Sequence, residues 1–233
     1  MLRTTDATLL RQTTLLSDAS EATFAELLTG AFLQAFPGHV ELFKEGDNAD
    51  FLFVVIEGMV ELYAGWEGRR STIATAGPSD TFILAAVVRS ASYLMSARTL
   101  GRCRLLMLPA VNVRAALASD SAFASSIIGE LAMCYRGIVK AQKNLKLRTG
   151  VERLAAYMVQ ACRNAGDLRQ FELDIDKQTL ASLLGMTPEN LSRALAILRA
   201  HGVSVKGSTI ILERVGELEQ LAKTTALIDD PQC

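Results

Sequence analysis

Histidine and cysteine, the residues that most often build catalytic and metal sites, are scarce in this sequence. The chain of 233 residues contains two histidines and four cysteines. The cysteines lie far apart and form no C-x-x-C pair, which leaves no metal-ligand spacing and favours free thiols. A Ser/His/Asp hydrolase arrangement is poorly supplied, and neither G-x-x-x-x-G-K nor G-x-G-x-x-G occurs. We therefore expect neither a metal site nor an enzymatic activity.

Long apolar runs are missing as well. The longest, residues 51–56 and 82–88, have the length of strands rather than that of the ~20-residue helix needed to cross a bilayer. The start of the sequence, MLRTTDATLLRQTT, lacks the charged residues followed by a continuous apolar core that mark a signal peptide. These patterns predict a cytoplasmic protein that does not contact a membrane.

Net charge is nearly absent too. A value of −1 argues against a protein that coats nucleic acid indiscriminately, but it leaves room for a sequence-specific reader. One basic stretch stands out, and either a solvated helix face or a DNA contact would account for it. Its members are Arg136, Lys140, Lys143, Lys146 and Arg148.

The hydrophobic half of the sequence is sufficient for a substantial core and for two domains. We expect two short helices in residues 6–30. After Gly30 the pattern changes to short runs of Val, Ile, Phe and Leu separated by turns that contain Gly or Pro. Such a pattern predicts an antiparallel sandwich or barrel between residues 35 and 108, with strands at 40–43, 51–56 and 59–63 and bends at Gly46 and Gly58.

A long helix is predicted from Asp120, a suitable N-cap, to residue 147. Apolar residues recur along it at spacings of three and four, which is typical of a coiled-coil seam. A helix buried against its own domain would show a similar stripe, but the length of the stripe and the basic residues beside it favour the interface of a homodimer. The predicted interface residues are Phe123, Ile127, Leu131, Cys134, Ile138, Ala141 and Leu145.

Residues 177–200 read as two short amphipathic helices joined by a tight turn at Gly185. The second helix is well marked, because Thr187 is a good N-cap, Pro188 fits the first helical position and Gly202 ends the helix. This is the layout of a helix-turn-helix, in which the second helix enters the DNA major groove. The DNA-binding residues are therefore expected to include Thr187 and Pro188 at the start of that helix. An ordinary helical hairpin with a solvated polar face is the alternative.

Three polar residues share the face of the second helix opposite its leucines, namely Glu189, Ser192 and Arg193. A glutamate can accept a hydrogen bond from cytosine N4, and an arginine can donate to guanine O6 and N7. The pair can therefore read a single G·C base pair. Beyond Gly202 a hairpin turning at residues 206–207 is predicted to form a wing, whose Lys206 and Ser208 would contact phosphate.

The phrase FKEGDNADFLFVVIEGMVELY, residues 43–63, resembles the β-roll of cyclic-nucleotide-binding domains, and specifically that of CRP/FNR regulators. The resemblance extends over nearly the whole chain. It implies an α+β fold with an antiparallel β-roll, a long dimerisation helix and a C-terminal winged helix-turn-helix. The domains would be an effector-sensing roll at 1–118, the dimerisation helix at 119–148 and the DNA-binding domain at 149–233.

The polar trio of the second helix resembles the E-x-x-S-R of the FNR, FixK and DNR (NnrR) branch. This likeness implies a palindromic operator with TTGAT-like half-sites, in which Arg193 and Glu189 share a G·C pair and Ser192 contacts a neighbouring thymine. It also implies double-stranded DNA and RNA polymerase as partners of a homodimer, and a small-molecule effector of unknown identity.

In relatives that bind cyclic AMP, the roll carries a glutamate for the ribose and an arginine-serine pair for the phosphate. The corresponding positions here are Ala85 or Ala86 for the glutamate and Ala91-Ser92 for the pair, so both charged ligands are missing and cyclic AMP is disfavoured. The residues expected near an effector are Phe82, Ala85, Arg89, Ala91 and Ser92.

The sequence bears on two metal-dependent mechanisms of the family. No cysteine precedes Cys103, so an iron-sulfur cluster of the FNR kind is not expected. A haem-dependent nitric oxide sensor of the DNR type stays open, with His39 as a candidate axial ligand. A regulator that needs no ligand, or a cyclic-nucleotide-binding regulatory module outside transcription, also stays open.

Overall fold

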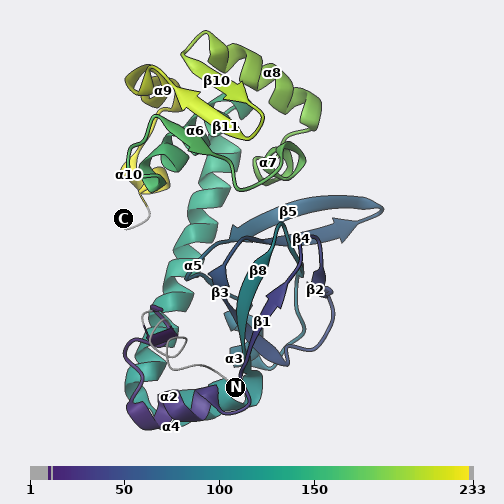
Figure 1. Ribbon diagram of the computed structural model, residues 1–233, viewed down its shortest axis with the longest axis vertical. Helices are drawn as coiled ribbons and strands as arrows, with labels where there is room; N and C mark the ends of the chain where they lie inside the picture. Colours follow the sequence, from purple (N-terminus) through teal and green to yellow (C-terminus); the bar gives the residue numbers. More distant parts are fainter. Residues whose placement is uncertain (1–9, 12, 231–233) are drawn as a thin grey trace. The chain divides into compact units, whose positions relative to one another are not determined.

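Residues 10–11 and 13–230 are described by the computed structural model, and the chain divides into two units between Cys134 and Tyr135. The division falls inside the longest helix, α5 (Ser121–Leu147), so that this helix contributes to both units (Figure 1).

Two four-stranded antiparallel sheets make up the first unit. Their strand orders are β1-β8-β3-β6 and β2-β7-β4-β5. The strands are β1 (Phe32–Phe36), β2 (Glu41–Phe43), β3 (Phe51–Glu57), β4 (Val60–Trp66), β5 (Arg69–Ala76), β6 (Thr81–Phe82), β7 (Ser96–Thr99) and β8 (Cys103–Pro109). Helices α2 (Glu21–Leu28), α3 (Leu84–Arg89) and α4 (Ala110–Ser119) accompany them. This arrangement confirms the predicted antiparallel roll.

Strand β3 shows why the roll has a single core. Its sequence FLFVVIE does not alternate, and four consecutive residues, 52–55, are buried because β3 lies between β8 and β6 and is covered on both faces. The interior also contains stacked aromatic rings. The centroids of Phe43 and Tyr93 are 4.0 Å apart and those of Phe53 and Phe82 are 5.2 Å apart. These rings fill the space between the sheets.

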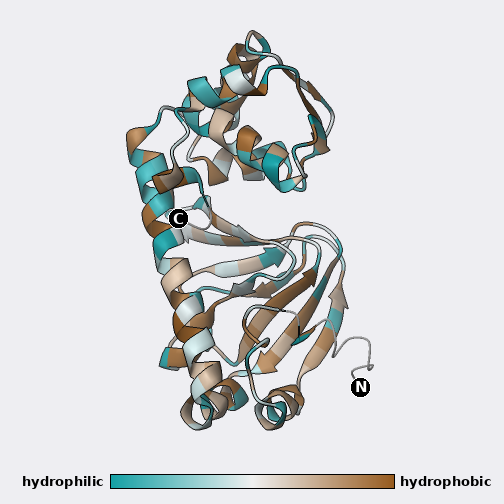
Figure 2. Ribbon diagram, turned by 90° about the vertical axis from the view of Figure 1, so that its left-hand side faces the viewer, coloured by the Kyte–Doolittle hydropathy of each residue, from teal (hydrophilic) through white to brown (hydrophobic). Residues whose placement is uncertain are grey.

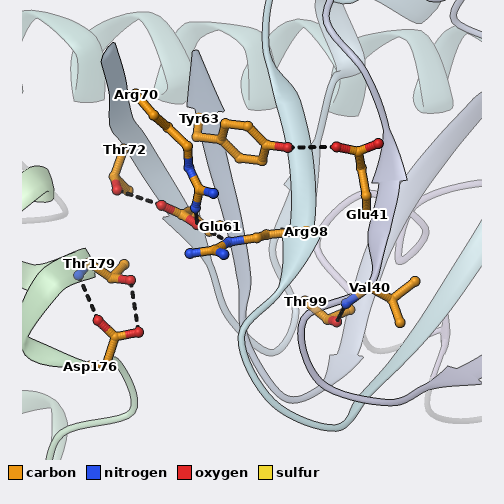
Figure 3. Close-up of polar contacts among 10 residues, drawn as sticks. All are labelled: Val40, Glu41, Glu61, Tyr63, Arg70, Thr72, Arg98, Thr99, Asp176 and Thr179. Atoms are coloured by element: carbon orange, nitrogen blue, oxygen red, sulfur yellow. Dashed lines mark hydrogen bonds and ion pairs between the residues drawn. The ribbon is translucent and has the colours of Figure 1, made fainter. Parts of the chain in front are cut away.

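A polar network lies on the outer face of the sheet formed by β2, β7, β4 and β5 (Figure 3). Val60 and Leu62 point into the core, so Glu61 between them points outward, yet it is only 1% exposed. Its Oε2 accepts hydrogen bonds from Arg70 at 2.6 Å and from Arg98 at 2.5 Å, and its Oε1 accepts one from the Thr72 hydroxyl at 2.6 Å (Figure 3). The two arginines therefore compensate the buried carboxylate and join three strands.

The turn between β3 and β4 depends on Gly58. Its φ of +87° is a left-handed conformation, and a Cβ atom at this position would lie 2.9 Å from Cys103 Cα and closer still to the Arg102 carbonyl oxygen. We expect Gly58→Ala to lower the free energy of unfolding by about 3 kcal/mol, because left-handed strain and a clash with backbone add. Urea denaturation followed by circular dichroism measures this loss.

Gly46→Ala is the matched control for Gly58→Ala. Gly46 has a similar φ of +90°, but nothing lies within 4 Å of a Cβ built there. It should therefore show only the conformational cost of about 1–2 kcal/mol. Equal losses in the two variants would contradict the importance of the close approach at Gly58.

Helix α5 carries large apolar side chains on its surface. By length and composition it could cross a membrane, as no other helix in the described part of the chain could, yet only 11% of its most apolar window is buried. Hydrophilic and hydrophobic segments alternate towards its C-terminal end (Figure 2). Exposed apolar area of this extent usually marks an interaction surface. The basic residues in its C-terminal half favour a protein partner over the interior of a bilayer.

The second unit is a winged helix-turn-helix. Its helices are α6 (Gly150–Asn164), α7 (Lys177–Leu183), α8 (Pro188–Arg199), α9 (Val215–Ala222) and α10 (Ala226–Asp229). Strands β10 (Val203–Lys206), β11 (Thr209–Leu212) and β9 (Gln170–Glu172) form a small antiparallel sheet in the order β10-β11-β9. Together with the roll and α5, this unit confirms the predicted α+β fold.

The junction between α5 and α6 is fixed by a capping box. Thr149 accepts from the Glu152 amide at 3.4 Å through its hydroxyl, and the Glu152 carboxylate accepts from the Thr149 amide at 2.7 Å. A hydrogen bond from Lys223 and then those from Thr149 lower the pKa of Glu152 to about 2. The start of α6 is thereby tied to the end of α9.

Arg148, at the same junction, is the most buried arginine of the described residues, with an exposed fraction of 6%. Its guanidinium donates to both carboxylate oxygens of Asp229 at 2.6 Å, to the Lys223 carbonyl at 2.9 Å and to the Asn144 side chain at 3.1 Å. The sequence predicted a solvated or DNA-contacting residue here. That interpretation is wrong for Arg148, because it holds α10 against the end of α5 instead.

Candidate nucleic-acid interface

Helix α7 and the turn that follows it are built as the sequence predicts. Asp176 caps α7, and its side chain accepts from the Thr179 amide at 2.7 Å (Figure 3). Gly185 forms the turn with a φ of +61°, and a Cβ atom there would lie 2.6 Å from a methyl carbon of Leu145. A glycine therefore suits the backbone conformation of the turn, and the Leu145 side chain packs directly over it.

Helix α8 begins at a well-formed cap. Thr187 accepts from the Asn190 amide at 3.3 Å through its hydroxyl, and Pro188 occupies the first helical position. Leu191, Ala194 and Leu198 are buried and anchor the helix on its domain. The predicted DNA-binding residues Thr187 and Pro188 thus position α8, although both are exposed.

The predicted reading residues all lie on the free face of α8. Glu189, Ser192 and Arg193 are exposed, and the Ser192 hydroxyl donates to the Pro188 carbonyl at 3.0 Å. Glu189's own amide, the Thr187 hydroxyl and, to a lesser degree, the Arg193 charge lower the pKa of the Glu189 carboxyl. The carboxylate is therefore ionised at neutral pH and suited to accept a hydrogen bond.

The wing is the hairpin of β10 and β11. Its turn contains Gly207, with a φ of +65°, and the exposed residues Lys206 and Ser208. The Ser208 carbonyl accepts from the Leu173 amide at 2.9 Å, which ties the turn to the segment before α7. Lys206 is the cation at the tip, as a phosphate contact would require.

The predicted seam of α5 needs correction at its N-terminal end. Phe123 and Ile127 are buried in the core of the roll, with exposed fractions of 0% and 1%, so they are wrong as interface residues. Leu131 is half-buried against the same core, whereas the four remaining members of the predicted seam are exposed, namely Cys134, Ile138, Ala141 and Leu145.

A neighbouring set of residues gives a regular stripe along α5 whose members are exposed, apart from the half-buried Leu131. Its members recur at spacings of three and four, and the polar Gln142 occupies the one position where the apolar pattern is interrupted. We call this set the α5 stripe, and it consists of Ile128, Leu131, Tyr135, Ile138 and Leu145. Ile128, Tyr135 and Ile138 are each more than 60% exposed. The periodicity of the sequence predicts an apolar stripe here, but the spacing alone does not show which apolar residues are exposed and which face the roll.

The residues predicted near an effector do not converge. Phe82 is 4% exposed and stacks on Phe53, so it belongs to the core and its assignment to an effector site is wrong. Ala85 and Arg89 are exposed on α3, while Ala91 and Ser92 lie in the loop between α3 and β7.

His39, the candidate haem ligand, is exposed in the turn between β1 and β2 with a φ of 63°. Its amide donates to the Thr99 carbonyl at 2.8 Å. Within the described residues no group of three or more His, Cys, Asp or Glu side chains could hold a metal ion. A haem role for His39 stays a prediction.

Comparison with known proteins agrees with this geometry. Residues 33–120 match the cyclic nucleotide-binding domain family, and residues 152–221 match the Crp-like helix-turn-helix domain. The chain belongs to the CRP/FNR family of transcription regulators. The matched helix-turn-helix region contains α7, α8 and the wing, so the alternative of an ordinary helical hairpin is excluded.

Individual relatives support the FixK-like branch of the CRP/FNR family. The nitrogen fixation regulation protein FixK of Azorhizobium caulinodans is 28% identical over 189 residues, which cover 77% of this chain and 74% of that protein. The CRP-like cAMP-activated global transcriptional regulator of Mycobacterium tuberculosis is 23% identical over 81% of this chain and 85% of its own length. The structure of FixK2 from Bradyrhizobium japonicum has the same fold, with a TM-score of 0.76 and 23% sequence identity. The match covers 84% of this chain and 99% of the FixK2 chain. The predicted membership is confirmed.

Proposed function

We propose that this CRP/FNR regulator binds a palindromic operator with TTGAT-like half-sites as a homodimer. The observation that carries the proposal is the free face of α8, where Glu189, Ser192 and Arg193 are exposed together near the start of the helix. A carboxylate and a guanidinium at this spacing suit the two sides of a G·C pair. The wing residue Lys206 adds a phosphate contact without sequence information.

The α5 stripe supports the homodimer. Exposed apolar residues at heptad-like spacing are stabilised when a second copy of the same helix covers them. A two-fold axis along α5 would present two copies of α8 about one duplex turn apart, on the order of 34 Å, to a palindromic site. We assign the interface to the α5 stripe with the flanking Cys134 and Ala141.

The roll is proposed to sense a signal other than cyclic AMP. Ala85 and Ala91 offer no charge to a cyclic phosphate or ribose, and the space between the sheets is filled by aromatic rings. We propose that the protein acts by binding and does not catalyse a reaction. We place it in the cytoplasm, with RNA polymerase as its second macromolecular partner.

Fluorescence anisotropy with a labelled duplex tests the proposal directly. A palindrome of two TTGAT half-sites should bind at least about a thousand-fold more tightly than a scrambled duplex of the same length. The affinity for the palindrome should fall steeply with salt. Equal affinity for the two duplexes would reject sequence-specific reading.

Replacement of Arg193 by alanine should remove the reading of one base pair. We expect Arg193→Ala to weaken binding by about 1–3 kcal/mol at the cognate G·C pair, because the two hydrogen bonds to guanine are lost. Changing that base pair should then cost the wild type affinity but leave the variant unaffected. Anisotropy titrations of both proteins with both duplexes measure this coupling.

Lys206→Ala is the control for Arg193→Ala. Because Lys206 is assigned to phosphate, its loss should weaken binding similarly for every sequence and reduce the salt dependence by about one counterion. If Arg193→Ala behaved in this uniform way as well, Arg193 would be a phosphate contact and the half-site assignment would fail.

A further inference from the structure

The first unit contains a pocket that the roll's aromatic core does not fill. It has a volume of about 410 Å³ and lies between the loop before β3, the loop after α3 and the first turns of α4. Its polar lining comes from Asn48, Asp50, Ser90 and Arg114, and Ala91 and Val111 contribute apolar wall. Of the residues predicted near an effector, only Ala91 lines this pocket.

Arg114 supplies the single positive charge among the lining residues. It is half-buried, and its one hydrogen bond in the described part of the chain runs from Nη1 to the Val87 carbonyl at 3.2 Å. No carboxylate of the described residues lies within ion-pair distance of it. A guanidinium has five N–H donors in a planar fork that matches a carboxylate. Arg114 therefore retains donors for an anionic group.

The remaining polar residues narrow the chemistry of a ligand. Ser90 and Asn48 offer a hydroxyl and an amide, whereas Asp50 places a negative charge in the same pocket. A dianion such as phosphate would be repelled by Asp50, while a monocarboxylate that also carries a hydroxyl or ammonium group could donate to it. The pocket therefore fits a small hydroxy or amino acid better than a phosphate dianion.

Helix α4 connects this pocket to α5. The helix ends at Ser119, and the next residue is Asp120, whose side chain accepts from the Ala122 and Phe123 amides at 3.0 Å and so caps α5. The other carboxylate oxygen of Asp120 accepts from the Ser20 amide at 3.0 Å. A ligand that binds Arg114 would thus favour one position of α4. Through the hydrogen-bonded junction at Asp120, it would also favour one arrangement of α5.

We propose that this pocket binds a small hydroxy or amino carboxylic acid through Arg114 and that this ligand is the effector of the regulator. The proposal rests on the proposed function for its regulatory part. The effector would then bind at the surface between α3 and α4 and not in the interior of the roll. The arginine that binds it would be Arg114 and not the exposed Arg89.

Binding is tested on the full chain without DNA. Glycolate, glycine and inorganic phosphate are titrated separately and followed by NMR chemical shifts and by thermal shift. At least one of the two carboxylates should bind saturably, and phosphate should bind at least about ten-fold more weakly. Absence of saturable carboxylate binding, or tighter binding of phosphate, would overturn the proposal.

Three variants and one control locate the site. Arg114→Gln should weaken carboxylate binding at least about ten-fold, and Ala91→Trp should block the pocket from its other wall without touching Arg114. Asp50→Asn should improve phosphate binding relative to carboxylate. Arg89→Gln, the same change on a neighbouring exposed arginine, should leave binding unchanged. Carboxylate binding that survives both Arg114→Gln and Ala91→Trp would place the ligand elsewhere and reject the site.

The regulatory part is separated from DNA recognition by a second measurement. Saturating carboxylate should change operator affinity in the wild type but not in Arg114→Gln, while both proteins keep their preference for the TTGAT palindrome. Binding without any change in operator affinity would overturn the effector role and leave the proposed DNA recognition intact. Loss of sequence preference in the wild type would instead refute the proposed function.

Discussion

Ile138→Asp should turn the proposed dimer into a monomer and lower its affinity for the proposed palindrome about 10²–10⁴-fold. Ile138 is 62% exposed in the middle of the α5 stripe, and a carboxylate at its position in a two-fold interface would meet its own copy across the axis. Losing the second DNA-binding head removes the effective concentration that links two half-site contacts, and that loss sets the expected range.

Met133→Asp provides a matched control for Ile138→Asp. Met133 is 51% exposed on the same helix but lies on the side opposite the α5 stripe, and the change in net charge is identical. We expect this variant to stay dimeric and to keep its operator affinity. Sedimentation velocity reports the oligomeric state of each protein, and anisotropy reports its affinity.

Two results would contradict this interface. A dimeric Ile138→Asp with full affinity would place the contact on another surface. Dissociation caused equally by Met133→Asp would show that any charge on α5 disrupts the assembly, so the stripe would not be specific. Circular dichroism of each variant distinguishes dissociation from unfolding, because a folded monomer retains its helical signal.

The DNA-reading element could be predicted from the sequence because its determinants are local. Leucine spacing, the cap at Thr187 and the turn at Gly185 all fall within about two dozen residues, and each has a direct physical consequence for the backbone. The same holds for the strands of the roll and their glycine bends. In these segments propensity, periodicity and turn chemistry agree.

The face of α5 could not be assigned in this way. Phe123 and Ile127 continue the same periodic pattern as Ile138, yet the first two pack on the roll and Ile138 is exposed. Periodicity identifies an apolar stripe but not the surface that covers it, because a domain core and a partner helix select the same side chains. Only the packing of the roll separates the two stripes.

Charge pairs between residues far apart in the chain also cannot be predicted from the sequence. Arg148 belongs to a basic run that looks solvated, and its partner Asp229 lies 81 residues further along the chain. Glu61 was likewise unremarkable in sequence, although two arginines and a threonine enclose it. Spacing rules along one helix or strand carry no information on such pairs.

Arg148→Ala should lower the free energy of unfolding of the DNA-binding unit by about 3–5 kcal/mol. The substitution leaves the Asp229 carboxylate, whose side chain is 13% exposed, without its two hydrogen bonds. Burial alone would raise the pKa of Asp229, but the hydrogen bonds from Arg148 and from the Thr225 amide lower it below its ordinary value. Urea denaturation at neutral pH, followed by circular dichroism, measures the loss.

Acid titration gives an independent readout of the same pair. Because the folded-state pKa of Asp229 lies below the unfolded value, its contribution to stability is present at neutral pH and is lost as the pH falls through the folded pKa. The difference in stability between wild type and Arg148→Ala should therefore shrink in acid. A difference that does not depend on pH would mean that Arg148 acts through packing and not through its charge.

A surface pair in the same unit serves as the control for Arg148→Ala. Arg163 and Glu219 are 2.6 Å apart with side chains 44% and 36% exposed, so Arg163→Ala should cost at most about 1 kcal/mol. The double variant Arg148→Met with Asp229→Leu should recover most of the loss, because neither partner then leaves a buried charge unpaired. If the double variant were as unstable as Arg148→Ala, the remaining contacts of Arg148 with Lys223 and Asn144 would be what holds α10 against α5.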